Sequence, residues 1–379
     1  MRKLFEAVYR YIREADIFLL ALCVISAAYG VVLISSASRS TVGGRVVTVQ
    51  VIALVLGVAA YVLMSLIDID IIADKSKLLV VFSVALISTL FIWGEAGDTG
   101  NKAWLRFGGI GIQPAEIVKI PFAIVIAHMV TEFKARRSLN SPLAVMQVIA
   151  VFGLLFGMIL FSSGDLGSAL VYVFILLSVM FLGGVRLRWF MMGVGVLAVS
   201  GPFIWSNFLT DRQRARIIAP FDPGVDPTGL DITWQASQSK MAIAAGKFSG
   251  QGLYKGALTQ SGMIPHQETD FIFSAAGEEL GFVGCFFIIL LLTVIIVRCV
   301  YVGIKSNSTL GLLVCVGMTA MLIFQTLENI GMCLGLAPVI GLTLPFFSYG
   351  GTSIVTVFAA MGVVSGIKMR PKPARFRTM

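Results

Sequence analysis

Asp270 stands where a long polar stretch gives way to an apolar one, in Pro265-His-Gln-Glu-Thr-Asp-Phe-Ile-Phe-Ser-Ala-Ala-Gly-Glu-Glu-Leu-Gly281. A carboxylate at such a boundary has water on one side and hydrocarbon on the other, so it can meet a substrate that is half lipid and half sugar. Carboxylates placed beside a reacting hydroxyl act as general bases. Asp270 is therefore the candidate catalytic residue, and the rest of the chain must bring a substrate to it.

Other ionisable residues interrupt apolar segments. Glu116 and Lys119 are three residues apart in Gln113-Pro-Ala-Glu-Ile-Val-Lys119, so on a helix they share one face. Ionisable residues inside membrane spans usually pair and mark function. A purely structural ion pair is the alternative for these two. Asp165, in Ser162-Ser-Gly-Asp-Leu-Gly167, is a second candidate site residue, and its alternative role is a helix N-cap.

The elements that hold these residues are membrane spans. Hydrophobic residues make up 57% of the chain, charged residues 13%, and the mean hydropathy is +0.92, which a water-soluble domain could not carry. Windows of roughly 20 residues, the length that crosses the hydrocarbon core, predict an all-α polytopic membrane protein with ten transmembrane helices. The ten predicted spans are 16–37, 46–67, 77–93, 113–133, 142–163, 165–182, 187–209, 271–298, 309–334 and 343–366.

The distribution of Lys and Arg predicts the orientation of these spans. With the N-terminus inside, eighteen of them lie at the inner ends and tails, and four lie in the short outer loops. Both termini are therefore expected in the cytoplasm, with the active site extracytoplasmic. The net charge of +9 is read as topology and as attraction to anionic membrane lipid, rather than as nucleic-acid binding.

No metal signature is present, because the five cysteines form no C-x-x-C pair and the two histidines, His128 and His266, are far apart in sequence. The segment 210–270 is a large extracytoplasmic loop between helices 7 and 8, and its 61 residues exceed any simple connector. It carries the basic run Arg212-Gln-Arg-Ala-Arg216 and a predicted surface helix over 234–245. The glycines that follow, up to residue 256, predict a mobile arm.

Under this topology the candidate residues share one side of the membrane. Glu116, Lys119, Asp165, Asp270 and Ser348 all lie near outer ends of spans, which favours one polar site open to the outer face over a path with two gates. Cations from the outer loops are candidates for phosphate binding, and Arg can bind phosphate bidentately. These cations are Arg106, Arg214, Arg216 and Lys240, with Lys119 added from its span. Such a cleft suits a polyprenyl-pyrophosphate substrate, with the acid deprotonating an attacking hydroxyl.

Three further features of the apolar segments bear on the structure. At least one of Glu278 and Glu279 is expected to need a partner such as Lys119 or a backbone donor, and Glu328 is another acid within a span. The tenth span opens with Leu344-Pro-Phe-Phe-Ser-Tyr-Gly-Gly351, where proline and paired glycines permit broken backbone that lines a cavity.

These motifs resemble the SEDS family of bacterial cell-wall polymerases, the group of RodA, FtsW and their sporulation relatives. The resemblance runs through all ten spans and is densest in W-L-R-F-G-G-I-G-I-Q-P-A-E-I-V-K (104–119), G-D-L-G (164–167), I-P-H-Q-E-T-D-F-I-F-S-A-A-G-E-E-L-G (264–281) and L-P-F-F-S-Y-G-G-T-S (344–353). Three shorter motifs, Q-R-A-R-I (213–217), Q-S-K-M-A-I (238–243) and T-Q (259–260), are more similar to RodA than to FtsW.

The resemblance implies a peptidoglycan glycosyltransferase that joins lipid II units into a β-1,4-linked glycan, with a class B penicillin-binding protein as partner. It implies that Asp270 is the essential acid and that Glu116, Lys119 and Asp165 are the matching family residues. The usual Gln-Pro before that last Asp is Ser163-Gly164 here, which puts the backbone shape in question. A divalent cation such as Mg²⁺ or Mn²⁺ is left open. The alternatives are a lipid II flippase, a division or sporulation polymerase, and a scaffold for the transpeptidase.

Overall fold

The protein forms a bundle of long apolar helices in a computed structural model, which describes residues 6, 9, 11–39, 44–95, 102–107, 110–207 and 209–370. Within these residues, ten helices are long and apolar enough to cross a membrane, which confirms the predicted all-α, ten-span architecture. The ten are α2 (Ile17–Ala37), α3 (Gly44–Leu66), α5 (Ser76–Trp93), α6 (Pro114–Ala135), α7 (Pro142–Ser163), α8 (Leu166–Gly183), α9 (Leu187–Asn207), α13 (Ile272–Lys305), α14 (Thr309–Cys333) and α15 (Gly351–Met369). The basic residues beyond 370 and before 11 lie outside the described residues.

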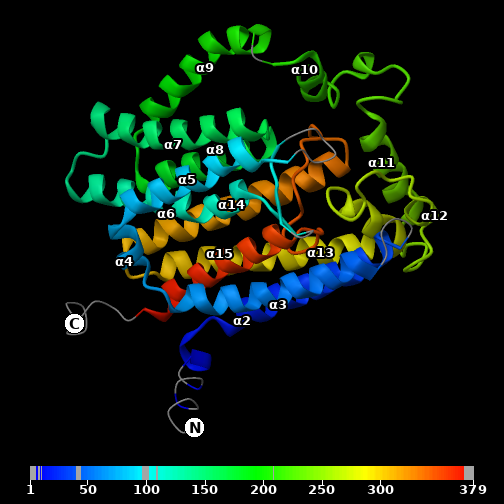
Figure 1. The fold of residues 1–379 in the computed structure, drawn as a ribbon, viewed down its shortest axis with the longest axis horizontal. Helices are drawn as coiled ribbons and strands as arrows, with labels where there is room; N and C mark the ends of the chain where they lie inside the picture. Colours follow the sequence, from blue (N-terminus) through cyan, green and yellow to red (C-terminus); the bar gives the residue numbers. More distant parts are fainter. Residues whose placement is uncertain are drawn as a thin grey trace.

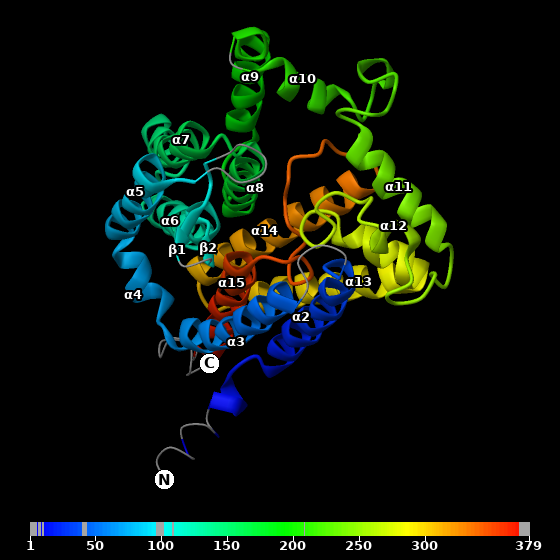
Figure 2. The ribbon, with the colours of Figure 1, turned by 45° about the vertical axis from the view of Figure 1, so that its right-hand side comes forward.

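The helices run roughly along one axis, with α6, α14 and α15 the most enclosed (Figure 1). In the most apolar part of α6, 78% of the residues are buried, whereas α9 has no buried residue at all. α9 stands away from the bundle in both Figure 1 and Figure 2. Polar side chains near the middle of α6 and α14 are therefore enclosed by protein, while α9 offers nearly its whole surface to lipid.

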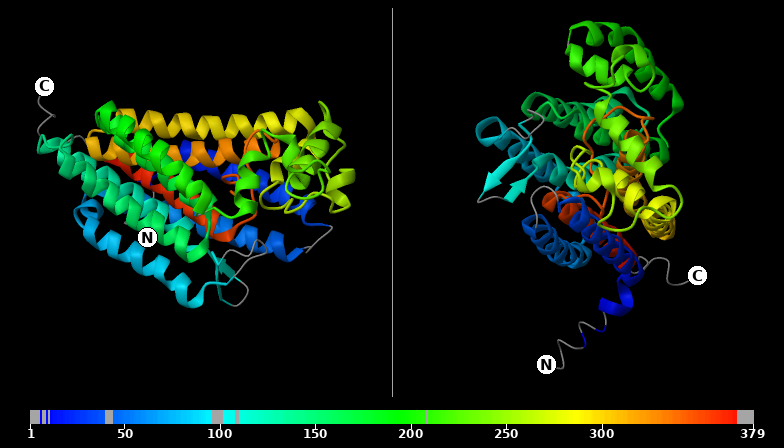
Figure 3. Two further views of the ribbon diagram at one scale, coloured as in Figure 1. Left: turned by 90° about the horizontal axis from the view of Figure 1, so that it is seen from above. Right: turned by 90° about the vertical axis from the view of Figure 1, so that its right-hand side faces the viewer.

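One end of the bundle is held by a buried charge cluster. Asp16, the N-cap of α2, is fully buried. Its carboxylate accepts a 2.8 Å hydrogen bond from Arg298 Nε, near the end of α13, and lies 3.6 Å from Lys368 Nζ, near the end of α15. The described beginning and end of the chain therefore meet at the end of the bundle opposite α11 and α12 (Figures 1 and 3).

The prediction for the tenth span was wrong at its start. Residues 343–350 are not helical, and α15 begins only at Gly351. Pro345 has no N–H to donate, and Phe346 has a left-handed φ of 69°, so helix cannot run through this stretch. The backbone is broken here, as the proline and paired glycines suggested.

The segment between α9 and α13 is folded rather than loose. It contains α10 (Asp211–Ile218), the 3-10 turn η1 (Pro223–Val225), α11 (Trp234–Gly246) and α12 (Ala257–Gln260). α11 confirms the predicted helix over 234–245. A short hairpin, β1 (Leu105–Phe107) with β2 (Ile110–Ile112), lies between α5 and α6, and α4 (Ile69–Asp74) joins α3 to α5.

The prediction of a mobile arm after α11 was also wrong. α13 is broken at Gly281, whose φ is 65° and ψ is −160°, and residues 247–252 fill the break. Gln251 N donates to Glu278 O at 3.0 Å, and Phe282 N donates to Lys247 O at 2.9 Å. A Cβ on Gly281 would lie 2.3 Å from Gly250 N, so the glycines serve close backbone contact.

Candidate active site

Asp270 is held at the start of α13 by its backbone. Its carbonyl accepts a 2.8 Å hydrogen bond from Asn329 Nδ2 of α14. A Cβ on Gly341 would lie 3.4 Å from Asp270 Oδ2, so the loop after α14 runs alongside the carboxylate. The N-cap of α13 is Phe271, with no side-chain cap bond, so the half-buried Asp270 carboxylate does not cap this helix.

The surroundings of Asp270 favour a base that works near neutral pH. Burial raises the pKa of its carboxyl to about 6; nearby His266 opposes this shift, and the negative charge of Asp165 adds to it. The structure thus brings Asp165 within electrostatic reach of Asp270, although they are far apart in sequence. An acid with this pKa is largely ionised at pH 7 and still basic enough to accept a proton.

Asp165 is both a helix cap and a member of this site. Its Oδ1 accepts from Ser168 N at 3.0 Å, and its Oδ2 accepts from Ser168 Oγ at 2.7 Å and from Gln113 Nε2 at 3.0 Å. The alternative role of Asp165 as a helix N-cap is therefore confirmed. Burial raises the pKa of this carboxyl. Gly164 takes a left-handed φ of 66°, which answers the question of backbone shape before Asp165.

Glu116 and Lys119 form the predicted ion pair inside α6. Both side chains are buried, Lys119 completely, and its ammonium contacts Glu116 Oε1. Glu116 Oε2 has no hydrogen-bond partner among the described residues. Asp165 is close enough for both charges to act on its carboxyl. The ion pair is therefore more deeply buried than Asp165, and the Lys119 ammonium does not reach an open surface in this conformation.

Ser348 contributes by holding two loops together. Its hydroxyl donates to Thr269 O at 2.6 Å and accepts from Leu344 N at 2.8 Å, so both of its hydrogen-bonding roles are occupied. Tyr349 N adds a 2.8 Å bond to Glu268 O. The loop before α15 is thereby fastened to the residues directly before Asp270. Ser348 is better placed to position the site than to bind a substrate.

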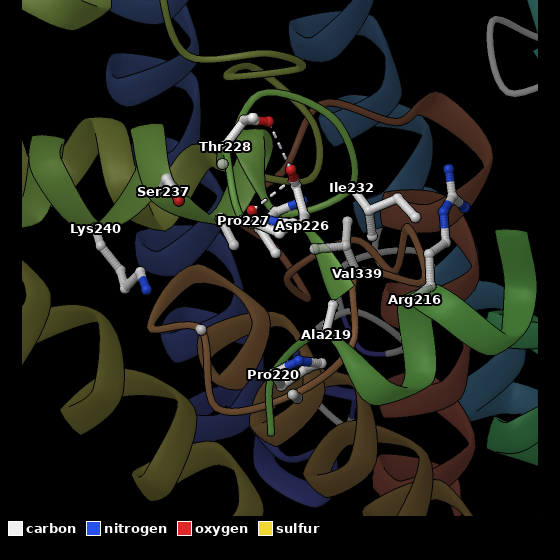
Figure 4. Close-up of a pocket in the computed structure, with 15 residues that line it drawn as sticks. Arg216, Ala219, Pro220, Asp226, Pro227, Thr228, Ile232, Ser237, Lys240 and Val339 are labelled. Carbon is white, nitrogen blue, oxygen red and sulfur yellow. Dashed lines mark hydrogen bonds between the residues drawn. The ribbon is translucent and has the colours of Figure 1, made fainter. Parts of the chain in front are cut away.

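The predicted phosphate-binding cations do not all come together. Arg216 and Lys240 line opposite sides of one pocket of about 380 Å³, formed by α10, α11 and the loop after α14 (Figure 4). Val339 lines the same pocket and is two residues from Gly341, so the loop that lines the pocket continues to the residue next to the Asp270 carboxylate. Burial, and then repulsion from Arg212, lower the pKa of Arg216.

The other two cations lie elsewhere. Arg214 donates to Asp211 Oδ1 at 3.1 Å and to Ser206 O at 2.8 Å, which ties α10 to the end of α9. Arg106, on β1, lies 4.0 Å from Glu95 and does not line the pocket. Neither lines the pocket of Arg216 and Lys240, so the four predicted cations do not share one pocket in this structure.

Glu278 and Glu279 find donors in α12 rather than Lys119: backbone N–H groups for Glu278 and a side-chain amide for Glu279. Glu278 accepts from Leu258 N and Thr259 N, each at 2.8 Å, and Glu279 accepts from Gln260 Nε2 at 2.8 Å. These bonds fasten α12 onto the first part of α13. Both acids are therefore structural in this conformation.

Sequence reasoning missed three amides that hold the site. Asn329 and Gln50 are fully buried in α14 and α3, and Gln113 precedes α6. Gln50 donates to Ser348 O at 3.1 Å and accepts from Gly350 N at 3.2 Å. Their signal in the sequence is a polar amide within or beside an apolar span. The predictions above considered only ionisable residues at such positions. Within the described part of the chain, no group of three or more His, Cys, Asp or Glu is arranged to hold a metal ion.

Comparison with known proteins places this geometry in context. The family model FTSW_RODA_SPOVE, described as cell cycle protein, matches residues 16–372. The chain is 31% identical to the peptidoglycan glycosyltransferase MrdB of Escherichia coli (strain K12), over 94% of this chain and 93% of MrdB. It is also 31% identical to the probable peptidoglycan glycosyltransferase FtsW of Trichlorobacter lovleyi, over 94% and 95% of the two chains. A chain from a solved peptidoglycan synthase complex that coordinates polymerization and crosslinking is 28% identical, with a TM-score of 0.79 over 93% of this chain and 97% of that chain.

Proposed function

Since the chain belongs to the cell cycle protein family FTSW_RODA_SPOVE and is a multi-pass peptidoglycan glycosyltransferase, we propose that Asp270 is its general base in joining lipid II units. Asp270 takes the proton from the 4-hydroxyl of the acceptor sugar as that oxygen attacks C1 of the donor sugar. The new β-1,4 glycosidic bond forms as the bond from C1 to the pyrophosphate breaks, and the polyprenyl pyrophosphate leaves with the electron pair. The attack comes from the opposite face, so the configuration at C1 is inverted.

The observation that carries this proposal is the carboxylate of Asp270 at the edge of the bundle, with its pKa raised to about 6. It is half-buried, between hydrocarbon-facing helices and the polar segment that contains α10 to α12. Arg216 and Lys240 lie in the pocket that the 335–341 loop also lines, where they can bind a pyrophosphate. Glu116 and Lys119 would contribute indirectly, because their charges set the electrostatic potential at the Asp165 carboxylate.

We further propose that the site faces outward, with both termini in the cytoplasm. The eighteen-to-four distribution of basic residues supports this orientation. The resemblance to RodA supports a role in cell elongation and shape, with a class B penicillin-binding protein crosslinking the nascent glycan. The similarity to a peptidoglycan synthase complex supports the same partnership.

The decisive experiment compares wild type with Asp270→Asn in purified form, supplied with lipid II, with and without a cognate transpeptidase. The amide keeps the shape of the side chain but cannot accept the proton, so we expect no glycan polymer on a gel and an unchanged melting temperature. Asp231→Asn, an exposed acid in the same outer segment, is the matched control and should polymerise normally. Polymer formed by Asp270→Asn at the wild-type rate would refute the assignment.

A labelling experiment tests the side of the membrane and separates a polymerase from a flippase. The five native cysteines are all buried and are first replaced. Single cysteines at the exposed positions Arg212 and Ser261 should react with an impermeant thiol reagent added outside, and those at Lys75 and Asn307 only when it is added inside. A flippase must expose one site to both faces in turn. A further single cysteine beside Asp270 should also react only from outside; substrate-dependent labelling of it from the cytoplasmic face would favour the flippase.

A further inference from the structure

Asn329 is a fully buried amide in the last third of α14, and it makes two hydrogen bonds from one nitrogen. Its Nδ2 donates to Asp270 O at 2.8 Å and to Leu342 O at 2.7 Å. One turn later on the same face, Cys333 Sγ lies 3.8 Å from the same Asp270 carbonyl. α14 thus holds the backbone of Asp270 at two successive turns.

The two carbonyls that Asn329 binds belong to irregular backbone at the edge of the bundle. Asp270 lies just before α13, and Leu342 lies in the loop that ends where α15 begins. Such carbonyls have no helical partner, and leaving them unpaired in a low-dielectric environment is costly. The Asn side chain carries two N–H groups on one nitrogen, which matches these two acceptors. A hydroxyl would supply one donor, and an apolar side chain none.

The Leu342 contact also fixes the second wall of the site. Leu342 is next to Gly341, the residue on which a Cβ would lie 3.4 Å from Asp270 Oδ2. One amide therefore sets the distance between the catalytic carboxylate and the loop beside it. That loop also lines the pocket of Arg216 and Lys240. The Asn329 amide therefore holds both the base and one wall of the proposed phosphate site.

We propose that Asn329 is a positioning residue for the glycosyl transfer, which sets the carboxylate of Asp270 against the 335–342 loop. This inference rests on the proposed role of Asp270 as general base. Asn329 itself touches no reacting atom. Because a displacement of about 1 Å at a reacting group can cost on the order of 10²-fold in rate, its loss should reduce turnover far more than substrate binding.

The test uses Asn329→Leu, which keeps the volume and removes both donors, and Asn329→Asp, whose protonated carboxyl can supply one. Thr319→Val is the matched control, since Thr319 is buried in the same helix and its hydroxyl has no hydrogen-bond partner among the residues that the structure describes. For each purified variant, kcat and KM for lipid II are measured per folded molecule, with the folded fraction taken from thermal unfolding in detergent.

We expect kcat to fall roughly 10- to 100-fold in Asn329→Leu and less in Asn329→Asp, with KM within about twofold of wild type. Thr319→Val should match wild type in kcat, in KM and in folded fraction. Wild-type kcat per folded molecule in either Asn329 variant would overturn the proposal, as would a rise in KM with kcat unchanged. If Asn329→Leu fails to fold, Asn329→Asp decides alone. Activity in Asp270→Asn would instead refute the proposed function, so the two failures are distinguishable.

Discussion

Removing one member of the buried Glu116–Lys119 pair should destabilise the protein more than removing both. Lys119 is fully buried and Glu116 is 4% exposed, so neither charge can be rehydrated in place. Lys119→Met leaves the Glu116 carboxylate without its cation, and its Oε2 already has no hydrogen-bond partner in the described chain. Breaking a buried pair in this way costs about 3–5 kcal/mol.

Glu116→Gln strands the ammonium of Lys119 and should cost a similar amount. The double variant removes both charges and keeps nearly the same volume, so it should lie within about 1–2 kcal/mol of wild type. The coupling free energy should therefore be about 3 kcal/mol or more, whereas independent sites add to within roughly 0.5 kcal/mol.

The assay is denaturant-induced unfolding of the four proteins in the same detergent, with the midpoints converted to free energies. A matched control pair exists on the same helix: Glu132 and Arg136 are four residues apart and exposed, with side chains 41% and 68% accessible. Their coupling should be only about 0.3–0.5 kcal/mol. If the single effects of Glu116→Gln and Lys119→Met simply add, the two residues are not energetic partners and the reasoning fails.

Three other predictions concern the active site and its frame. Asp270 works ionised and its pKa of about 6 lies above the ordinary aspartate value, so the initial rate should rise with pH through about 6. Asp165→Asn removes a neighbouring negative charge and should move this limb to lower pH; a limb that stays in place would contradict the electrostatic link. Arg216→Ala and Lys240→Ala should each raise KM for lipid II, measured by initial rates, and an unchanged KM in both would remove the pocket from the site. Gly281→Ala forces a Cβ against backbone at a left-handed φ of 65°, so it should lower the melting temperature and the yield; a stable, active protein would show that the break in α13 is not required.

The sequence by itself determined the spans and singled out the candidate catalytic residue. A helix that crosses hydrocarbon must carry a long apolar run, so composition alone located all ten helices. Every charge inside such a run is expensive, which is why Glu116 and Lys119 stood out and why their pairing could be predicted from spacing. Asp270 stood out because the sequence changes from polar to apolar there, and such a change marks the boundary of a membrane span.

Only the tertiary structure decided how the irregular segments are held. Residues 342–350 and 247–252 form no regular helix or strand, and hydrogen bonds from α3, α14 and the break in α13 hold them in place. Which of the four outer cations share a pocket was likewise set by how α10 and α11 pack, since their spacing along the chain carries no such information. A helix satisfies its own backbone, so its residues reveal it; a broken backbone in a membrane is satisfied by distant side chains such as Asn329, and no local pattern identifies them.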